Sequence, residues 1–144
     1  MPGEESNPAP GPQGFGSCCG ELKDAMSGEE FEPLITVGDD GPIVSHLPML
    51  LDTAVAPYGT LAGHLARGNP QWSKSDLAKQ AVVIFAGPDA YVSPVWYASK
   101  QEHGRVVPTW NYVAVHAHGP VEFFEDADRL RDVVTRLTNL YERP

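Results

Sequence analysis

One polar and aromatic stretch, residues 87–119, restricts most strongly what this chain can fold into. Its sequence is GPDAYVSPVWYASKQEHGRVVPTWNYVAVHAHG, with two of the three tryptophans, three of the five tyrosines and three of the five histidines. This mixture is too polar for a plain core hairpin. Because ligand pockets combine apolar and aromatic walls with a few hydrogen-bonding groups, the stretch predicts a pocket for a flat ligand with polar edges.

Strand patterns lie within this stretch and on both sides of it. Residues 89–99 and 109–118 predict two strands that are joined by a polar loop at 100–105. The apolar run at 81–86, AVVIFA, predicts a central strand that is buried on both faces. The weak alternation of PVEFFE at 120–125 predicts a return strand.

The preceding residues add further strands. LITVG at 34–38 and PIVSHLPMLL at 42–51 flank the turn Asp39-Asp40-Gly41, a pattern typical of a β-hairpin. Residues 59–66 predict another strand, in which Gly63 marks a bulge or a close approach of the backbone.

The last segment changes to helical spacing, and either Asp126 or Asp128 is placed to cap the helix. Its apolar positions are Leu130, Val133, Val134, Leu137, Leu140 and Tyr141. Six or seven strands and one amphipathic helix predict a mainly β domain, an antiparallel barrel or sandwich that carries a helix.

Composition separates the first 32 residues from the rest. Residues 1–32 carry seven acidic side chains against Lys23 alone, and residues 1–20 are rich in proline and glycine, so we expect a disordered segment with at most a short helix at 21–31. The folded domain is expected to cover 33–144. Cys18 and Cys19 are adjacent, a spacing that suggests two exposed thiols and neither a disulfide framework nor a zinc site.

Charge and targeting patterns limit the expected partners. Residues 33–144 carry twelve acidic and nine basic side chains and no basic run, which makes direct DNA binding doubtful. The N-terminus lacks the basic start and apolar run of a secretory signal. No apolar stretch approaches the roughly 20 residues of a membrane helix, so we expect a cytoplasmic protein that does not enter a membrane.

Several polar groups in residues 87–119 are candidates for a phosphate site. Hydroxyl, ammonium and guanidinium groups hold phosphates well, and here they come from Ser93, Ser99, Lys100, Arg105 and Thr109. The alternative is that the two cations only keep an exposed loop soluble. Trp96 and Trp110 offer surface for stacking on a tricyclic ring, although large aromatic residues in β-proteins are often ordinary core.

The histidines leave alternatives open. His46 and His64 each stand alone in an apolar segment, as hydrogen-bonded core residues or as axial ligands of a haem. His116 and His118 share one strand face, but no third ligand stands at a diagnostic spacing for a metal. Arg67 and Asn69 could bind an anionic group. The alternative is that Arg67 is only a solvated charge beside a turn.

No catalytic triad or pair of carboxylates follows from the spacing, so the catalytic residues stay unknown and any enzyme chemistry is expected to come from a cofactor. Four segments, however, resemble the PaiB-like family, described as FMN-binding negative transcriptional regulators. They are SHLPMLLD (45–52), GTLAGHLARGNPQW (59–72), VIFAGPDAYVSPVWY (83–97) and HGRVVPTWNYVAVHAHG (103–119).

This resemblance covers residues 33–142 and implies a split antiparallel β-barrel that binds FMN at the interface of a homodimer. Its implied FMN site is lined by Ser93, Lys100, Thr109, Trp110 and Asn111, and His64, Arg67 and Asn69 complete it. Any effect on transcription is expected to be indirect. Family members continue beyond the position of Pro144 through a Gly-Lys-rich segment, so the chain is similar to a C-terminally truncated member.

Two alternatives stand beside FMN binding. Piperazate synthases are similar around His46, His64 and residues 69–72 and use haem, which suggests a haem- or flavin-dependent enzyme that acts on a small metabolite. The other alternative is a truncated domain that binds no cofactor.

Overall fold

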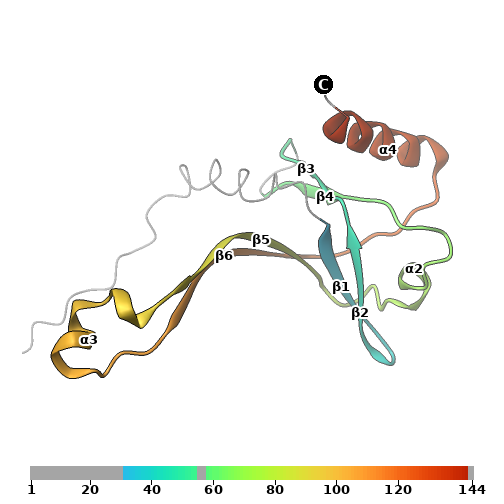
Figure 1. The fold of residues 1–144 in the computed structure, drawn as a ribbon. Helices are drawn as coiled ribbons and strands as arrows, with labels where there is room; N and C mark the ends of the chain where they lie inside the picture. The colour runs from blue at the N-terminus through green and yellow to red at the C-terminus, as the bar shows by residue number, and fades with distance from the viewer. Residues whose placement is uncertain (1–30, 55–57, 143–144) are drawn as a thin grey trace, which may run out of the picture.

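The structure is a computed structural model that describes residues 31–54 and 58–142. In these ranges four strands form an antiparallel sheet in the order β2-β1-β5-β6 (Figure 1). Two short strands, β3 (Leu50–Asp52) and β4 (Thr60–Ala62), pair with each other. The expectations for residues 1–30, including the short helix and the two cysteines, lie outside the described residues.

The predicted hairpin is confirmed as β1 (Glu32–Gly38) and β2 (Gly41–Leu47), but its second strand ends at Leu47, and residues 50 and 51, predicted in the same strand, belong to β3. Gly41, directly after the turn, takes a φ of 114°, a conformation that glycine adopts easily because it lacks a Cβ. β1 begins at Glu32 and not at Leu34, because Glu32 pairs with Leu47 and is buried.

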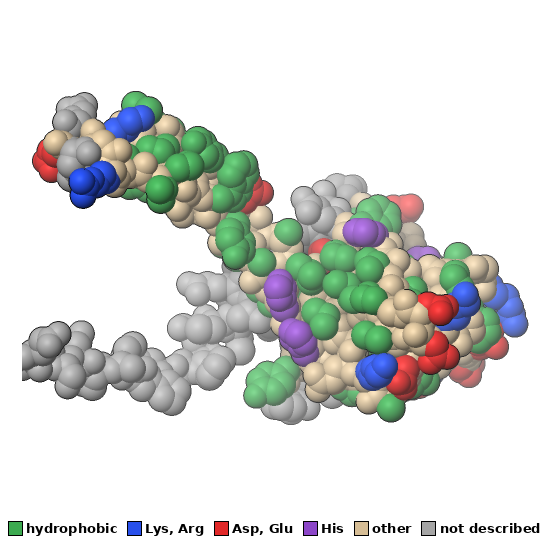
Figure 2. Space-filling model, turned by 90° about the horizontal axis from the view of Figure 1, so that it is seen from below, with side chains coloured by type: hydrophobic (Ala, Val, Ile, Leu, Met, Phe, Trp, Pro, Cys, Tyr) green, Lys and Arg blue, Asp and Glu red, His purple; other side chains and the backbone are tan. Residues whose placement is uncertain are grey.

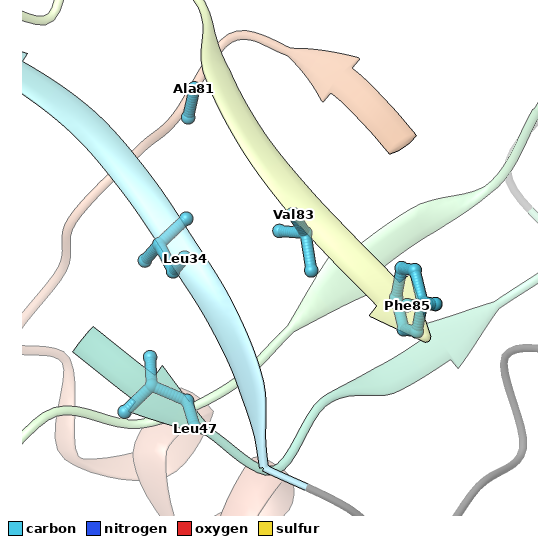
Figure 3. Packing of buried hydrophobic residues seen from close by; sticks show 5 residues of the cluster. All are labelled: Leu34, Leu47, Ala81, Val83 and Phe85. Atoms are coloured by element: carbon cyan, nitrogen blue, oxygen red, sulfur yellow. The ribbon is translucent and has the colours of Figure 1, made fainter. Parts of the chain in front are cut away.

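The core of the sheet consists of five packed side chains, Leu34, Leu47, Ala81, Val83 and Phe85 (Figure 3). Ala81, Val83 and Phe85 alternate along β5 (Ala81–Val92), as expected for a strand with one buried face, and Leu34 and Leu47 join them from β1 and β2. The prediction that 81–86 is buried on both faces is therefore wrong for this structure, because Val82 and Ile84 stay partly exposed.

The strands β5 and β6 (Thr109–Gly119) continue beyond the core as a two-stranded ribbon (Figure 1). We call residues 87–114 the arm and the remaining described residues the body. The register of the two strands shifts between Ala86 and Asp89, which marks a bulge at the base of the arm.

The far end of the arm is helical, where the sequence predicted the end of a strand and a polar loop. A 3-10 turn, η1 (Pro94–Trp96), is followed by the helix α3 (Ala98–His103). Ser93 Oγ accepts a hydrogen bond from the Val95 N–H and caps η1. Gly104 ends α3 with a φ of 67°, a usual C-terminal conformation for glycine.

The C-terminal helix α4 (Ala127–Tyr141) is capped by Asp126, one of the two predicted caps, whose Oδ1 accepts from the Arg129 N–H at 2.8 Å. Val133 and Leu137 pack against Leu50 of β3.

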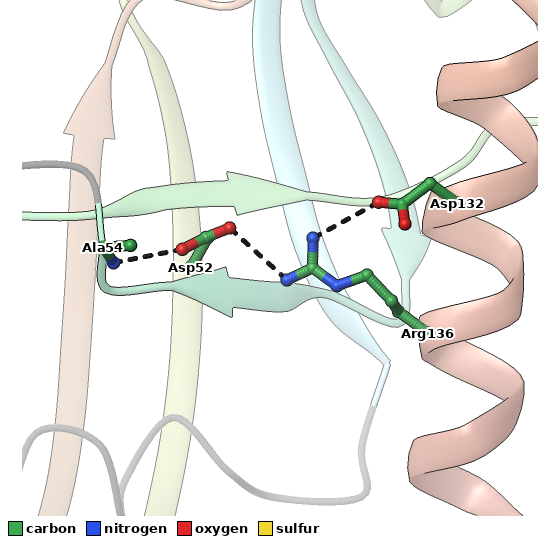
Figure 4. Close-up of polar contacts among 4 residues, drawn as sticks. All are labelled: Asp52, Ala54, Asp132 and Arg136. Carbon is green, nitrogen blue, oxygen red and sulfur yellow. Dashed lines mark hydrogen bonds and ion pairs between the residues drawn. The ribbon is translucent and has the colours of Figure 1, made fainter.

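At the surface beside this contact, Arg136 lies between two carboxylates, 3.5 Å from Asp52 and 3.4 Å from Asp132 (Figure 4). Because all three side chains are about 40% or more exposed, these ion pairs contribute little to stability.

The predicted fold class, mainly antiparallel β with a C-terminal amphipathic helix, is confirmed. The sheet stays open, because the edge strands β2 and β6 do not pair with each other in the described part of the chain. Of the strand predicted at 59–66, only residues 60–62 form a strand, β4. The close approach of the backbone predicted at Gly63 is confirmed, because a Cβ there would lie 3.1 Å from the Pro48 carbonyl oxygen.

The return strand predicted at 120–125 is absent, since this described segment has no regular structure. Two of its apolar side chains pack on the body instead: Val121 contacts the core of the sheet, and Phe124 packs against the cluster of Leu50, Val133 and Leu137. No helix in the described ranges is long and apolar enough to cross a membrane.

Candidate functional site

Five of the predicted site residues lie on the arm, and their positions follow from its local structure. Ser93 and Lys100 lie at its far end, next to η1 and within α3, and three others stand at the start of β6: Thr109, Trp110 and Asn111. The Lys100 side chain is exposed. The arm therefore carries groups of the kinds that a phosphate and a polar ring edge would require.

Trp110 belongs to an aromatic face of the arm. Its ring lies 5.8 Å from that of Tyr91 on the paired strand, with an angle of 55° between the ring planes. Its Nε1–H donates to Asp89 Oδ1 at 2.9 Å, which fixes the direction of the indole. Trp96 and Trp110 are 72% and 59% exposed, so the alternative that they are ordinary core residues is wrong for this structure.

Thr109 and Asn111 point away from this aromatic face, because neighbouring residues in a strand alternate between its two sides. Asn111 borders a shallow cavity of about 240 Å³ at the bulge, with Pro88, Asp89, Ala90, Tyr112 and Val113. Ligand pockets usually measure about 300–1,000 Å³. This cavity is therefore too small to hold a whole nucleotide cofactor.

The other three predicted site residues lie on the body. His64 is exposed in the segment after β4, and Arg67 forms an exposed ion pair with Glu125 at 3.2 Å. Asn69 uses both atoms of its carboxamide within the protein. Its Nδ2 donates to Ser45 Oγ at 2.8 Å, and its Oδ1 accepts from the Gln71 N–H at 2.9 Å. Asn69 therefore fixes the loop to β2.

The two groups of predicted residues lie apart within one copy of the chain. Figure 1 shows α3 at the far end of the arm, whereas β4 and the short helix α2 (Gln71–Lys74) lie on the body. Within one copy of the chain, the structure thus does not bring the arm residues to His64, Arg67 and Asn69.

The histidines do not form a metal centre in the described part of the chain. The rings of His116 and His118 lie 6.5 Å apart, and both side chains are exposed. His46 and His64 are exposed as well, so the reading of these two as buried core residues is wrong. No group of three or more histidine, cysteine, aspartate or glutamate side chains that could hold a metal occurs among residues 31–54 and 58–142.

A larger cavity of about 650 Å³ lies between the β1–β2 turn and α2. Three carboxylates border it, Asp39, Asp40 and Asp76, with Lys74 as the cation among its lining residues. Because carboxylates repel phosphate, this cavity does not suit a phosphorylated cofactor despite its size.

Nothing in the sequence analysis singled out Gln71. Gln71 is fully buried, and its Nε2 lies 3.0 Å from the Leu34 carbonyl oxygen and 3.1 Å from that of Ile43. It also donates to Thr36 Oγ1 at 3.0 Å. This carboxamide joins α2 to the β1–β2 hairpin. Its position directly after Asn69-Pro70 gave no sign of burial, because its partners are distant in sequence.

Comparison with known proteins agrees with the sequence pattern. Residues 17–144 match the family described as "Putative FMN-binding domain". The chain is 34% identical over 123 residues to the "Protease synthase and sporulation protein PAI 2" of Bacillus subtilis, covering 85% of this chain and 56% of that protein.

An uncharacterized protein of Saccharomyces cerevisiae is 32% identical over 105 residues, which cover 72% of this chain and 62% of the yeast protein. One from Emericella nidulans is 33% identical over 58% of this chain and 42% of its own length. The chain thus spans about half the length of the curated relatives that it matches. The chain belongs to the PaiB-like family of FMN-binding domains.

Proposed function

We propose that this chain binds FMN and that the arm supplies the cofactor-binding groups. The observation that carries the proposal is the exposure of Lys100 on α3, and of Thr109, Trp110 and Asn111 on β6, along the arm of a chain in the FMN-binding family. Large exposed apolar patches often mark sites that a ligand or partner covers, and the exposed aromatic residues of the arm form such a surface.

The arm residues have complementary roles in this proposal. Lys100 and Ser93 would hold the phosphate at the far end of the arm, since an ammonium and a hydroxyl both donate to phosphate oxygens. Trp110 would cover the flavin ring, and Thr109 and Asn111, which point to the other side of the arm, would bond to polar ring edges of the flavin from the arm of a second copy. Bound FMN would supply the redox chemistry, and the chain would bind and orient it.

We further propose that the complete site forms between two copies of the chain. Trp110 and Asn111 point to opposite sides of the arm, and the described cavities are too small or too acidic for FMN. A homodimer would let His64, Arg67 and Asn69 of a second copy approach the arm of the first. Any effect on transcription would then be indirect, which agrees with the formal net charge of −9.

The structure offers no separate support for a haem site at His46 or His64. A haem ligand needs an imidazole in an apolar pocket, and both of these side chains are exposed. FMN binding is therefore the one function that we carry forward.

Replacing Lys100 with alanine tests the phosphate role. We expect Lys100→Ala to weaken FMN binding roughly 10- to 100-fold, the value of a charge-assisted hydrogen bond. Quenching of FMN fluorescence during titration measures the affinity. Lys79→Ala is the matched control, because Lys79 lies on the body and pairs with Asp76 at 3.5 Å. Equal affinities for Lys100→Ala and the unmodified chain would contradict the assigned role.

A further inference from the structure

The aromatic face of the arm, formed by Tyr91, Trp110 and Tyr112, is open to solvent. The arm projects from the body, and hydrophobic side chains gather along it (Figure 2). All three aromatic residues are exposed. An exposed side chain usually samples several rotamers, and a ligand that binds against it has to fix one of them at a cost in entropy. Trp110 is therefore a ready surface for a ring only if a neighbouring group holds its indole.

A single extra residue in β5 brings Asp89 to the side of the arm on which Trp110 lies. Ala86 pairs with Ala114 and Asp89 with Tyr112, so three steps along β5 correspond to two steps along β6. Residues that pair across two strands point to the same side of a sheet, and so do residues two apart on one strand. Asp89 therefore shares a side with Tyr112 and Trp110.

Without this bulge, Asp89 would stand on the other side of the ribbon. Phe85 is buried in the core, and strict alternation along β5 would turn residue 89 to the same side as Phe85. The local sequence suits a bulge, because Pro88 has no N–H to donate to a strand ladder. Gly87 leaves room for Val113, whose Cβ would lie 3.0 Å from a Cβ added at residue 87. Bulges are frequent next to active sites, where they redirect a side chain.

The Asp89 carboxylate fixes the direction of the Trp110 indole. Trp110 Nε1–H donates to Asp89 Oδ1 at 2.9 Å, and a hydrogen bond to an ionised acceptor is stronger than one to a neutral group. Because Trp110 is exposed, water could also satisfy this N–H, so the bond to Asp89 serves mainly to orient the ring. Tyr91 contacts the same indole, with 5.8 Å between the ring centroids. The indole is thus held both at its N–H and at its ring.

Asp89 lies where its charge does not oppose a phosphate at the tip of the arm. Lys100 belongs to α3, at the far end of the arm, whereas Asp89 follows the bulge at the base (Figure 1). Salt screens the interaction between exposed charges that stand well apart. The hydrogen bond to Trp110 is therefore the main contribution that Asp89 can make to the site.

We propose that Asp89 is a positioning residue, whose carboxylate presets the indole of Trp110 in the orientation in which it covers the ring of the cofactor. A side chain that is already fixed in its bound orientation loses less freedom on binding, so the affinity is higher. This role of Asp89 rests on the proposed function, because it requires a flat ring against Trp110.

Nuclear magnetic resonance of the 144-residue chain without FMN tests the hold on Trp110. The chain has three tryptophans and therefore three indole N–H signals, and Trp110→Phe identifies the signal of Trp110. We expect Asp89→Ala to move this signal and to speed its exchange with water. Asp89→Asn should keep the signal near its original position, because an amide oxygen still accepts the hydrogen bond. A Trp110 signal that Asp89→Ala leaves unchanged overturns the proposal.

Titration with FMN measures what the fixed indole contributes to binding. We expect Asp89→Ala to weaken FMN binding roughly 3- to 10-fold, the effect of immobilising one side chain, and Asp89→Asn to stay within about twofold of the unmodified chain. In a Trp110→Phe background, which has no indole N–H, Asp89→Ala should have no further effect. Asp128→Ala removes an exposed carboxylate from α4 and is the matched control, which should leave the affinity unchanged.

The variants separate this role from FMN binding itself. Equal losses of affinity in Asp89→Ala and Asp89→Asn, or a loss that persists in the Trp110→Phe background, overturn the proposal, because Asp89 would then act by its charge or by supporting the fold. If Asp89→Ala fails to fold, Asp89→Val takes its place, since valine favours a strand and also lacks an acceptor. A chain that takes up no FMN, but whose Trp110 signal responds to Asp89→Ala, contradicts the proposed cofactor and supports the hold of Asp89 on Trp110.

Discussion

Gln71→Ala is expected to lower the free energy of unfolding by about 2–4 kcal/mol. The substitution removes three hydrogen bonds from a fully buried side chain and leaves the carbonyls of Leu34 and Ile43 with one donor fewer. It also leaves a cavity between α2 and the hairpin. Urea unfolding followed by circular dichroism gives the change directly.

Gln80→Ala is the matched control for this prediction, because Gln80 is exposed immediately before β5. Surface substitutions of this kind usually change stability by less than about 0.5 kcal/mol. Gln71 Oε1 is buried without a partner in the described part of the chain, so its removal offsets a part of the loss. A loss as small as that of the control would show that the carboxamide does not hold the loop.

Gly38→Ala is expected to destabilise the domain by about 1–3 kcal/mol, the usual effect of an added group in a packed site. A Cβ at Gly38 would collide with the backbone carbonyl oxygen of Lys74 and would meet Ile43 Cδ1 at 3.0 Å. Because the first obstacle is backbone, it cannot move aside by a rotamer change. Gly38 also bridges to Ser75, so the strain would act on the contact between β1 and α2.

The matched control is Gly68→Ala in the loop before α2. A Cβ at Gly68 would meet no atom within 4 Å, and no positive φ occurs there. Such a change is expected to be neutral or to stabilise by up to about 1 kcal/mol, since alanine restricts the unfolded chain. Thermal unfolding of both variants measures the difference, and equal midpoints would contradict the close approach at Gly38.

The sequence predicted correctly those elements whose pattern of apolar residues and whose turn or cap residues lie close together in the chain. The β1–β2 hairpin follows from two apolar strands around Asp-Asp-Gly, and α4 follows from helical spacing behind Asp126. α3 was missed although Gly104 provides a helix stop, because the tyrosine and histidine residues nearby suggested a strand and a loop. Residues 98–103, ASKQEH, include several residues with a high helix propensity, and they form a helix despite the aromatic residues nearby.

The sequence did not predict which polar side chains are buried, because burial depends on contacts between residues that are distant in the chain. Gln71 is buried by partners about 30 residues earlier in the chain, and no local pattern reports this. The histidines at 46 and 64 looked internal because their neighbours are apolar, yet alternation along β2 points His46 outward. The residues proposed to bind the cofactor came from the polar and aromatic composition of residues 87–119 together with the family resemblance, whereas their division between two faces of the arm required the structure.

The absorption spectrum of the purified 144-residue chain, before and after addition of FMN, tests the central claim most directly. We predict a protein-bound flavin spectrum and quenched flavin fluorescence, because FMN would lie against Trp110 in a site formed with the arm. A chain that neither retains FMN nor perturbs the spectrum of added FMN would contradict this account, and a Soret band after addition of haem would favour the haem alternative in its place.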